Sequence, residues 1–395
     1  MEHNLMNPSN RKTIFSFLFL ALFSCQPPHQ TQSIIMNDIS IIPKPNSTQI
    51  LNTTFDLKSI KGIILKNESQ EERHIGEIFQ AYLNPAVSLS ISKSSSESNI
   101  DHIIISLDES SEIPDEGYEL NVGEHHRIEL TASSSSGLFY GFQTFRQLCP
   151  PKLENGETPK NSRIQNFKIT DYPRFAYRGM HLDVSRHFFD VEFVKTYIDM
   201  IALHKMNVFH WHLTDDNGWR IEIKKHPELT EKSAWRVDRT HEPWREWSPI
   251  QPNEKASYGG FYAQDEIREV VQYAADRNIM VVPEIEMPGH TSEVFSAYPN
   301  LSCKGDTLPV NPGSYWPNDD IFCVGNDEVF TFLENVLSEV VELFPGPYIH
   351  IGGDEATKTN WETCPKCQKR LRDEGLKNEH ELQSYFIKRI EKFVL

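Results

Sequence analysis

The chain has 395 residues, and its 56 acidic residues outnumber 39 basic ones, which gives a formal net charge of -17. This balance argues against a nucleic-acid partner, because no basic excess offsets the repulsion from phosphate groups. The content of 38% hydrophobic and 24% charged residues is ordinary for a globular protein, and the length is sufficient for two domains.

The N-terminus has the pattern of a secretory signal. Arg11 and Lys12 precede a mostly apolar run over residues 14–23, and Ser24 and Cys25 follow. A basic start, a short apolar core and a small residue before the cleavage point are typical of a signal peptide. The run is too short to span a bilayer, so we predict an exported protein.

The end of this run also resembles a bacterial lipobox, in which a cysteine becomes the lipidated first residue. The segment is Leu22-Phe23-Ser24-Cys25, and because Phe23 is unusual there, cleavage by an ordinary signal peptidase is the alternative. We expect a signal peptide over 1–25, a tether over 26–35 and a candidate lipid anchor at Cys25. These features predict a periplasmic or outer-membrane lipoprotein of a bacterium.

Five cysteines follow this region, and export makes disulfides chemically accessible. Cys364 and Cys367 form a single C-x-x-C without a second pair at zinc-finger spacing, so the spacing disfavours a metal site. A redox motif also lacks its usual setting. Cys303 can pair with Cys323 or with Cys364, and the sequence does not decide between them. We expect no metal and no cofactor.

Residues 36–170 have the pattern of a mixed α/β domain. Short strands, separated by polar turns, are expected over 104–107, 118–122 and 128–131. The spacing of Leu138, Phe142 and Phe145 predicts a helix over 137–148 with one apolar face. No catalytic cluster is recognisable, so we interpret this domain as a supporting one.

Strand and helix patterns alternate over residues 171–395. The expected strands lie at 175–184, 206–213, 279–285 and 348–351. Helices are expected after the N-capping residues Asp190 and Asp265 and over 330–343. Repeated β-then-α units predict parallel strands with right-handed crossovers, and a TIM-type (β/α)8 barrel is the best fit. A doubly wound sheet is the alternative, but no G-x-G-x-x-G follows any predicted strand.

Each predicted strand of this C-terminal domain delivers polar side chains at or near its carboxyl end. In chain order these are Arg178, Asp183 and Arg186; His210, His212, Asp215 and Asp216; Glu284, Glu286 and His290; and His350, Asp354 and Glu355. Such groups at one end of otherwise apolar strands predict an active site, because parallel barrels place their chemistry there.

His210 and His212 also permit a metal site, because residues i and i+2 of a strand share a face. With Asp354 or Glu286 they would outline a metal-dependent hydrolase. No third histidine completes a ligand set by its spacing, so a hydrogen-bonded histidine pair beneath the site is the favoured explanation.

The last polar group stands in His350-Ile351-Gly352-Gly353-Asp354-Glu355, where two adjacent carboxylates follow a short apolar run and a glycine pair. A carboxylic acid at a strand end can protonate a leaving group if its pKa is raised. The alternative is a structural Asp-Glu pair at the end of a strand.

Four runs carry a resemblance to a known family. They are Asp171-Tyr172-Pro173-Arg174-Phe175 with Arg178-Gly179-Met180, Asn207 to Asp216, Pro283 to His290, and His350 to Glu355. In this order they resemble glycoside hydrolase family 20, the β-N-acetylhexosaminidases, and the preceding domain is similar to the small α/β domain that often leads this family. The resemblance implies exo-acting, retaining hydrolysis of terminal β-linked N-acetylglucosamine or N-acetylgalactosamine from oligosaccharides or glycoconjugates. The acetamido oxygen of the substrate would be the nucleophile.

The resemblance also implies roles for the matching residues. Glu355 would be the general acid/base, and Asp354 would orient the acetamido group. Arg178 would hold hydroxyls of the terminal sugar. No metal or cofactor is implied. The remaining expected positions are Asp215 and His290, as a hydrogen-bonded pair near the acid, and Asp216 and His212 in support.

The C-terminal part is shorter than a complete barrel requires. A (β/α)8 barrel takes roughly 250 residues, and the stretch 171–395 contains a long insertion over 221–263. The last helix, capped by Asn378 with Glu381 three residues on, runs to the end of the sequence without a C-cap. We expect a barrel truncated after about four β/α units. A non-catalytic glycan-binding lipoprotein is the alternative that this expectation leaves open.

Overall fold

The computed structural model describes residues 40–93, 101–313 and 318–395. The predicted signal peptide (1–25) and tether (26–35), with Cys25, lie outside these residues. Within the described ranges, no helix combines the length and the apolar character that crossing a membrane requires.

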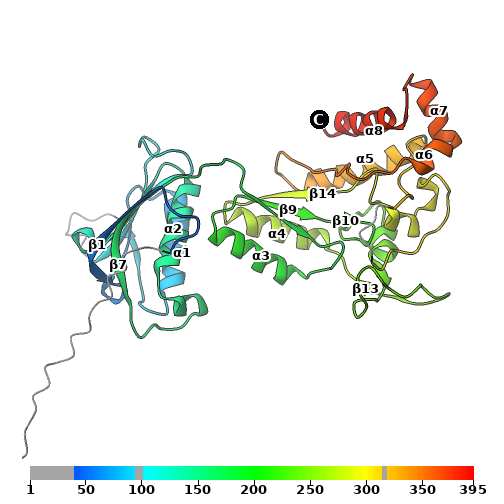
Figure 1. Cartoon of the computed structure of the whole chain (residues 1–395). Helices are drawn as coiled ribbons and strands as arrows, with labels where there is room; N and C mark the ends of the chain where they lie inside the picture. The colour runs from blue at the N-terminus through cyan, green and yellow to red at the C-terminus, as the bar shows by residue number, and fades with distance from the viewer. Residues whose placement is uncertain (1–39, 94–100, 314–317) are drawn as a thin grey trace, which may run out of the picture. The chain divides into compact units, whose positions relative to one another are not determined.

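A seven-stranded sheet forms the N-terminal domain, in the order β1-β7-β5-β6-β4-β2-β3. Its strands are β1 (Ser47–Asp56), β2 (Gly62–Leu65), β3 (Ile91–Lys93), β4 (His102–Leu107), β5 (Tyr118–Val122), β6 (Ile128–Ala132) and β7 (Arg163–Asp171). Helices α1 (Gln70–Leu83) and α2 (Ser135–Leu148) cover one face of this sheet and pack against each other (Figure 1). The rings of Phe79 and Phe142 meet there at 4.9 Å between centroids. The predicted strands and helix of this domain are confirmed to within two residues at their ends.

The C-terminal domain contains three parallel strands in the order β14-β9-β8. They are β8 (Gly179–Asp183), β9 (Val208–His212) and β14 (Met280–Glu284). Helix α3 (Val191–Leu203) follows β8, and α4 (Gln264–Ala275) precedes β14 (Figure 1). The three strands lie side by side in the order in which they occur along the chain, and a helix lies between each strand and the next, as in a (β/α)8 barrel. The described residues do not close into a barrel.

The fourth predicted strand, at 348–351, is reduced to one parallel bridge between His350 and Glu284. The His350 amide donates to the Pro283 carbonyl at 2.9 Å, and its own carbonyl accepts from the Ile285 amide at 3.0 Å. Gly352 and Gly353 then adopt left-handed φ values of 63° and 101°, which turn the chain out of strand geometry.

Two predicted helix caps are confirmed. The Asp190 carboxylate accepts a hydrogen bond from the Phe193 amide at 2.9 Å, one turn into α3. The Asn378 side chain accepts one from the Glu381 amide at 3.1 Å, at the start of the last helix. Each side chain satisfies an amide that has no partner within its own helix.

The predicted cap at Asp265 is wrong. Helix α4 begins two residues earlier than such a cap requires, at Gln264, with Ala263 in the cap position. The Glu266 carboxylate accepts the Ala263 amide at 2.8 Å, and Glu222 accepts the Gln264 amide at 2.9 Å. These two acids satisfy the helix start without help from Asp265.

The predicted insertion over 221–263 is anchored by two buried arginines, Arg220 and Arg236. Arg220 donates to the Ala234 carbonyl and to the Ser185 carbonyl, both at 2.6 Å. Burial lowers the pKa of Arg220 to about 10. Because this value is still above neutral pH, the guanidinium remains charged and donates to these carbonyls. Two short strands, β10 (Thr214–Asp215) and β11 (Gly218–Trp219), precede the insertion, which contains η4 (Leu229–Ser233), β12 (Trp235–Val237) and β13 (Ala256–Gly259).

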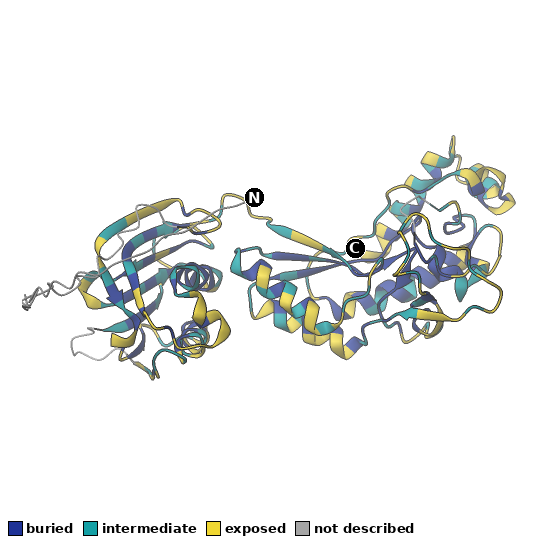
Figure 2. Cartoon of the chain, turned by 60° about the horizontal axis from the view of Figure 1, so that its bottom comes forward, coloured by how far each residue is buried: buried dark blue, intermediate teal, exposed yellow. Residues whose placement is uncertain are grey.

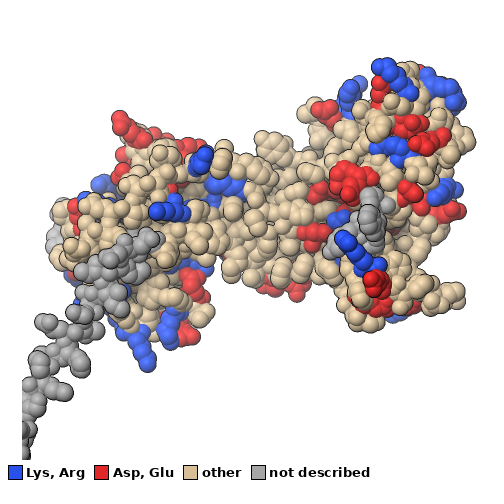
Figure 3. All heavy atoms as spheres, viewed as in Figure 1, with Lys and Arg blue, Asp and Glu red and all other residues tan. Residues whose placement is uncertain are grey.

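Burial and charge follow the ordinary division of a folded protein. Strands β2, β9 and β14 are largely buried, whereas helices such as α3 and α4 have both buried and exposed positions (Figure 2). Acidic and basic side chains are interspersed on the face shown in Figure 3. The remaining helices are η1 (Leu57–Ser59), η2 (Glu124–His126), η3 (Pro151–Asn155), η5 (Ser292–Ser296), η6 (Pro299–Leu301), α5 (Asp327–Leu343), α6 (Thr359–Thr363), α7 (Pro365–Asp373) and α8 (Glu379–Val394).

Candidate active site

The carboxyl ends of the three parallel strands lie side by side. The register pairs Asp183 of β8 with His212 of β9, and His212 with Glu284 of β14. Side chains that follow these positions therefore meet at one edge of the sheet, as parallel strands require. The predicted residues gathered there are His212, Asp215, Asp216, His290, Asp354 and Glu355.

Asp215 lies at the centre of this cluster and is almost completely buried. Its Oδ2 atom is 2.6 Å from Nη2 of Arg186 and 3.2 Å from Nε2 of His212. Its Oδ1 atom is 3.3 Å from Nδ1 of His290 and accepts the Asp216 amide at 2.7 Å. Burial alone raises the pKa of Asp215, but the two imidazoles and then the guanidinium outweigh it and hold this pKa at about 2. Asp215 is therefore a fixed negative charge.

His290 connects this buried charge to the two exposed acids. Its Nδ1 atom faces Asp215 and lies 3.4 Å from Oδ2 of Asp216, while its Nε2 atom is 3.3 Å from Oε2 of Glu355. The same Nε2 atom is 3.8 Å from Oδ2 of Asp354. Burial lowers the pKa of His290, but Asp215 and Asp216 outweigh it and raise this pKa to about 11. The expected proximity of Asp215, His290 and Glu355 is thus observed, with a charged imidazolium between carboxylates.

The backbone before the two acids depends on glycine. A Cβ atom added to Gly352 would lie 1.7 Å from Oε2 of Glu286, so only glycine fits at this positive φ. The Gly353 carbonyl accepts a hydrogen bond from the Gln383 side chain of α8 at 2.7 Å. This turn leaves the side chains of Asp354 and Glu355 65% and 51% exposed, respectively, at the open edge of the sheet.

Glu286 is a buried acid that the sequence placed at the strand ends and considered only as a ligand in the metal alternative. Burial first, and then the charges of Asp354, Glu284 and Asp215, raise its pKa to about 9. The carboxyl group is therefore protonated at neutral pH. Because it is neutral, Glu286 adds no further negative charge to the cluster near Asp354.

The two histidines of the predicted metal alternative both contact Glu284. Nε2 of His210 and Nδ1 of His212 lie 2.7 Å and 3.3 Å from its Oε2 atom, and Nδ1 of His350 lies 2.6 Å from its Oε1 atom. Burial alone raises the pKa of Glu284, but His210 and His350 lower it well below the ordinary range. The donor atoms of His181, His210 and Glu284 are close enough to hold a cation. The same contacts also fit the other alternative, in which the histidines are paired with the Glu284 carboxylate and bind no metal.

The position of Arg178 contradicts its predicted role. Arg178 precedes β8, so it lies at the amino end of the strand, opposite the edge that carries Asp354 and Glu355. Its guanidinium donates to both carboxylate oxygens of Glu116, at 2.9 Å and 3.1 Å, and to the Lys205 carbonyl at 2.8 Å. The strand was predicted over 175–184 but begins at Gly179, so Arg178, which was counted among the carboxyl-end groups, lies before the strand.

Arg186 is the arginine that the structure brings to the site. It follows β8 and lies 3.0 Å from Oδ2 of Asp183 and 2.6 Å from Oδ2 of Asp215. The sequence named Arg186 among the strand-end groups but gave it no contact. The spacing Asp183-x-x-Arg186 directly after a strand was the available signal, since it favours an i,i+3 ion pair.

A parallel sheet with paired acids and a charged histidine at its carboxyl edge has the arrangement in which TIM-barrel enzymes carry their active sites. Residues 175–395 match "Glycosyl hydrolase family 20, catalytic domain", and residues 38–172 match "Glycosyl hydrolase family 20, domain 2". The chain belongs to glycosyl hydrolase family 20, with a TIM-barrel catalytic domain preceded by a small domain.

Individual relatives agree with this assignment. A Beta-hexosaminidase of Porphyromonas gingivalis is 40% identical over 378 residues, covering 94% of this chain and 46% of the relative. A Beta-hexosaminidase of Vibrio furnissii is 37% identical over 361 residues, covering 90% and 55%. The chain thus spans about half the length of the curated relatives it matches.

Two solved structures show the same fold. The beta-N-acetylhexosaminidase from Bacteroides fragilis superposes with a TM-score of 0.72 at 35% identity, covering 90% of this chain and 64% of that one. A mutant Streptomyces plicatus beta-hexosaminidase in complex with product (GlcNAc) gives a TM-score of 0.74 at 33% identity, covering 90% and 63%.

Proposed function

We propose that this chain carries the catalytic acids of an exo-acting β-N-acetylhexosaminidase. Its substrates are terminal, non-reducing β-linked N-acetylglucosamine or N-acetylgalactosamine residues of oligosaccharides or glycoconjugates. The observation that carries the proposal is the Asp354–Glu355 pair, held beside the His290 imidazolium at 3.3 Å from Glu355. Support comes from relatives named beta-hexosaminidase and from a similar fold described in complex with GlcNAc.

The chemistry assigns different work to the two acids. The acetamido oxygen of the substrate attacks the anomeric carbon, and Glu355 donates its proton to the departing glycosidic oxygen. Asp354 accepts the acetamido N–H and stabilises the positive charge of the resulting oxazolinium. The Glu355 carboxylate then takes a proton from water, which attacks the same carbon and restores the acetamido group. Two inversions leave the product with retained β configuration.

The buried residues behind these acids fix their position and charge. The Asp215 carboxylate, held by Arg186, keeps His290 charged, and His290 stands within contact distance of Glu355. This arrangement stabilises the Glu355 carboxylate once its proton has left. His212 contacts Asp215, and Asp216 contacts His290, so both residues hold this pair in place.

Asp354 supplies the test that distinguishes this reaction from other hydrolyses. Asp354→Asn should lower kcat by about two orders of magnitude and change KM far less, because charge stabilisation is needed mainly in the transition state. A thiazoline analogue of the oxazolinium intermediate should inhibit the parent protein tightly and the variant weakly. Equal inhibition of both proteins would sink the assignment, and sugar binding without turnover by the parent would favour a glycan-binding protein.

Two further proposals concern the architecture and the location. We propose that β8, β9, β14 and the bridge at His350 correspond to the first four strands of the family's barrel, which their order and parallel direction support. We also propose that the protein is exported and lipid-anchored at Cys25, on the signal pattern at the N-terminus.

A further inference from the structure

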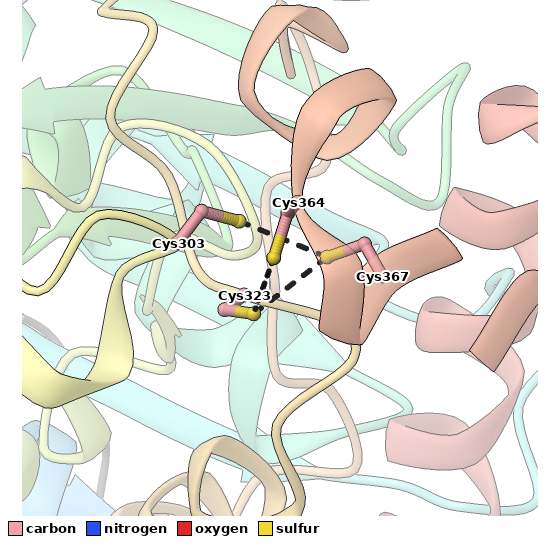
Figure 4. A group of neighbouring side chains, drawn as sticks. All are labelled: Cys303, Cys323, Cys364 and Cys367. Carbon is pink, nitrogen blue, oxygen red and sulfur yellow. Dashed lines mark hydrogen bonds between the residues drawn. The ribbon is translucent and has the colours of Figure 1, made fainter. Parts of the chain in front are cut away.

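Four cysteines outside the proposed active site converge in the C-terminal domain. The Sγ atoms of Cys303, Cys323, Cys364 and Cys367 all lie within 4.8 Å of one another (Figure 4). Cys323 is 3.7 Å from Cys364 and 3.6 Å from Cys367, and Cys303 is 3.7 Å from Cys367, measured between sulfur atoms. The sequence left Cys303 able to pair with Cys323 or with Cys364, and its cysteine spacing disfavoured a metal site.

We propose that these four side chains bind one Zn²⁺ ion as thiolates in a closed, structural site. Thiolate sulfurs lie about 2.3 Å from zinc, so a tetrahedral ligand set separates its sulfurs by about 3.8 Å. The observed separations match this edge length. A disulfide needs sulfurs about 2.05 Å apart. Cys323, moreover, has two sulfur neighbours at nearly equal distance, whereas a disulfide joins only one pair.

The surroundings suit thiolate ligands. Cys323, Cys364 and Cys367 are buried and Cys303 is half-buried, so the cluster is largely shielded from water. Helix α7 begins directly after Cys364 and has Cys367 in its first turn, where the helix dipole and the free amides favour negative charge.

Backbone contacts bring the two halves of the ligand set together. Ser302 and Phe322 form an antiparallel bridge, and each is followed directly by a cysteine of the cluster. A Cβ atom added to Gly325 would lie 2.1 Å from the Lys366 carbonyl carbon and 2.3 Å from the Cys367 amide nitrogen. Only glycine permits this close approach between the loop and the C-x-x-C segment.

The location gives the ion a structural role. The loop after β14 carries His290 and then two of the cysteines, while the segment after Glu355 carries the other two. The same two segments are joined by the Trp361 side chain, which donates to the Phe322 carbonyl at 2.9 Å. With all four ligand positions occupied by cysteines, zinc would have no open position for a substrate, and it would hold the two segments together beside the site.

Metal analysis of the full chain tests the proposal. Protein purified without added metal or chelator should contain one zinc per chain by inductively coupled plasma mass spectrometry. Replacement by Co²⁺ should give the intense visible bands of tetrahedral cobalt with thiolate charge transfer. Cys367→Ser should lower the zinc content at least tenfold after a mild chelator wash, whereas Cys149→Ser should keep one zinc. Cys149 is a matched control, because it is buried in the N-terminal domain, outside the cluster.

Alkylation in denaturant distinguishes the other states of the four thiols. Under the zinc assignment, the four cysteines react without reduction once a chelator is present. If they react only after reduction, they form disulfides and the proposal is overturned. Stoichiometric iron, four free thiols without any metal, or wild-type zinc retention in Cys367→Ser would also overturn it. If Cys367→Ser does not fold, the zinc content and cobalt spectrum of the parent chain decide.

Discussion

At the residue scale, the site is a chain of charges with fixed signs. The pKa of Asp215 near 2 and that of His290 near 11 keep both groups ionised across the range in which proteins work. Glu355 lies at the solvent end of this chain, where a proton can be exchanged with substrate and water. The buried partners therefore set the electrostatic field around Glu355, which under the proposed function is the group that exchanges a proton with the substrate.

Glu355→Gln tests the acid role. We expect kcat on a substrate with a poor leaving group to fall by about two to four orders of magnitude, because the glutamine cannot donate a proton. An aryl glycoside with an acidic leaving group should lose less in glycoside cleavage, since it needs less protonation. Steady-state kinetics on both substrates measure the difference, and Glu362→Gln, an exposed position on α6, is the matched control. Equal losses on both substrates would contradict the acid role.

Glu286→Gln tests the neutral buried acid through stability. The pKa of Glu286 is raised from 4.5 to about 9, so its contribution to folding is fully present below pH 4.5 and is lost as pH rises to about 9. The glutamine variant does not ionise. Relative to the parent, it should therefore gain stability between pH 5 and pH 8, by up to about 1.4 kcal/mol per pH unit.

Urea unfolding at several pH values measures this relative change. The difference between parent and variant isolates Glu286, because the shifted Asp215 and His290 are common to both proteins. A pH-independent difference would show that Glu286 is ionised in the folded state and that its surroundings have been misjudged.

At the element scale, the short turn after the bridge at His350 determines where the two acids stand. Gly352 combines a left-handed φ of 63° with direct contact to Glu286, and Gly353 is tied to α8 through Gln383. Glu286 and Gln383 therefore both restrict the conformation of this turn. A change in its backbone would move both Asp354 and Glu355 relative to His290.

Gly352→Ala should show this dependence. The methyl group meets Glu286 and the φ angle disfavours a side chain, so we expect a loss of about 1–3 kcal/mol in unfolding free energy and a marked drop in kcat/KM. Gly375→Ala is the control, because Gly375 has a similar φ of 65° with nothing within 4 Å of an added Cβ. It should lose only about 1 kcal/mol and keep full activity. Equal effects of the two variants on activity would refute the special role of Gly352.

At the scale of the whole molecule, local patterns predicted the layout of the fold. Alternating strand and helix segments, with caps such as Asp190, were sufficient to expect parallel strands. Since parallel strands share one carboxyl edge, the meeting of Asp215, His290 and Glu355 followed from the same pattern. The family resemblance then added roles that the spacing alone does not give.

The features that the sequence did not predict depend on contacts between distant segments. The strand expected from residue 175 begins only at Gly179, because the segment with Phe175 and Tyr177 is exposed, and Arg178 therefore lies before the strand. The neutral state of Glu286 arises from burial among other acids. The cysteine cluster escaped the spacing rules because its second pair, Cys303 and Cys323, is assembled by a strand bridge across a loop.

The exposed edge of the C-terminal sheet gives a prediction for the described domain pair. Strand β8 pairs only with β9 among the described residues, and Met180 on this edge strand is 42% exposed. An unpaired edge with apolar side chains favours association with another chain. Residues 37–395, prepared alone, should therefore form dimers or larger species.

Light scattering across a concentration series measures this association. Met180→Lys should shift the distribution toward monomer, because a charge on an edge strand opposes pairing with a second edge. Met200→Lys is the matched control: Met200 is 54% exposed, but it lies on helix α3, away from the sheet edge, and should leave the distribution unchanged. A preparation that is monomeric at every concentration would contradict the prediction, and it would mean that the edge of β8 needs no further partner.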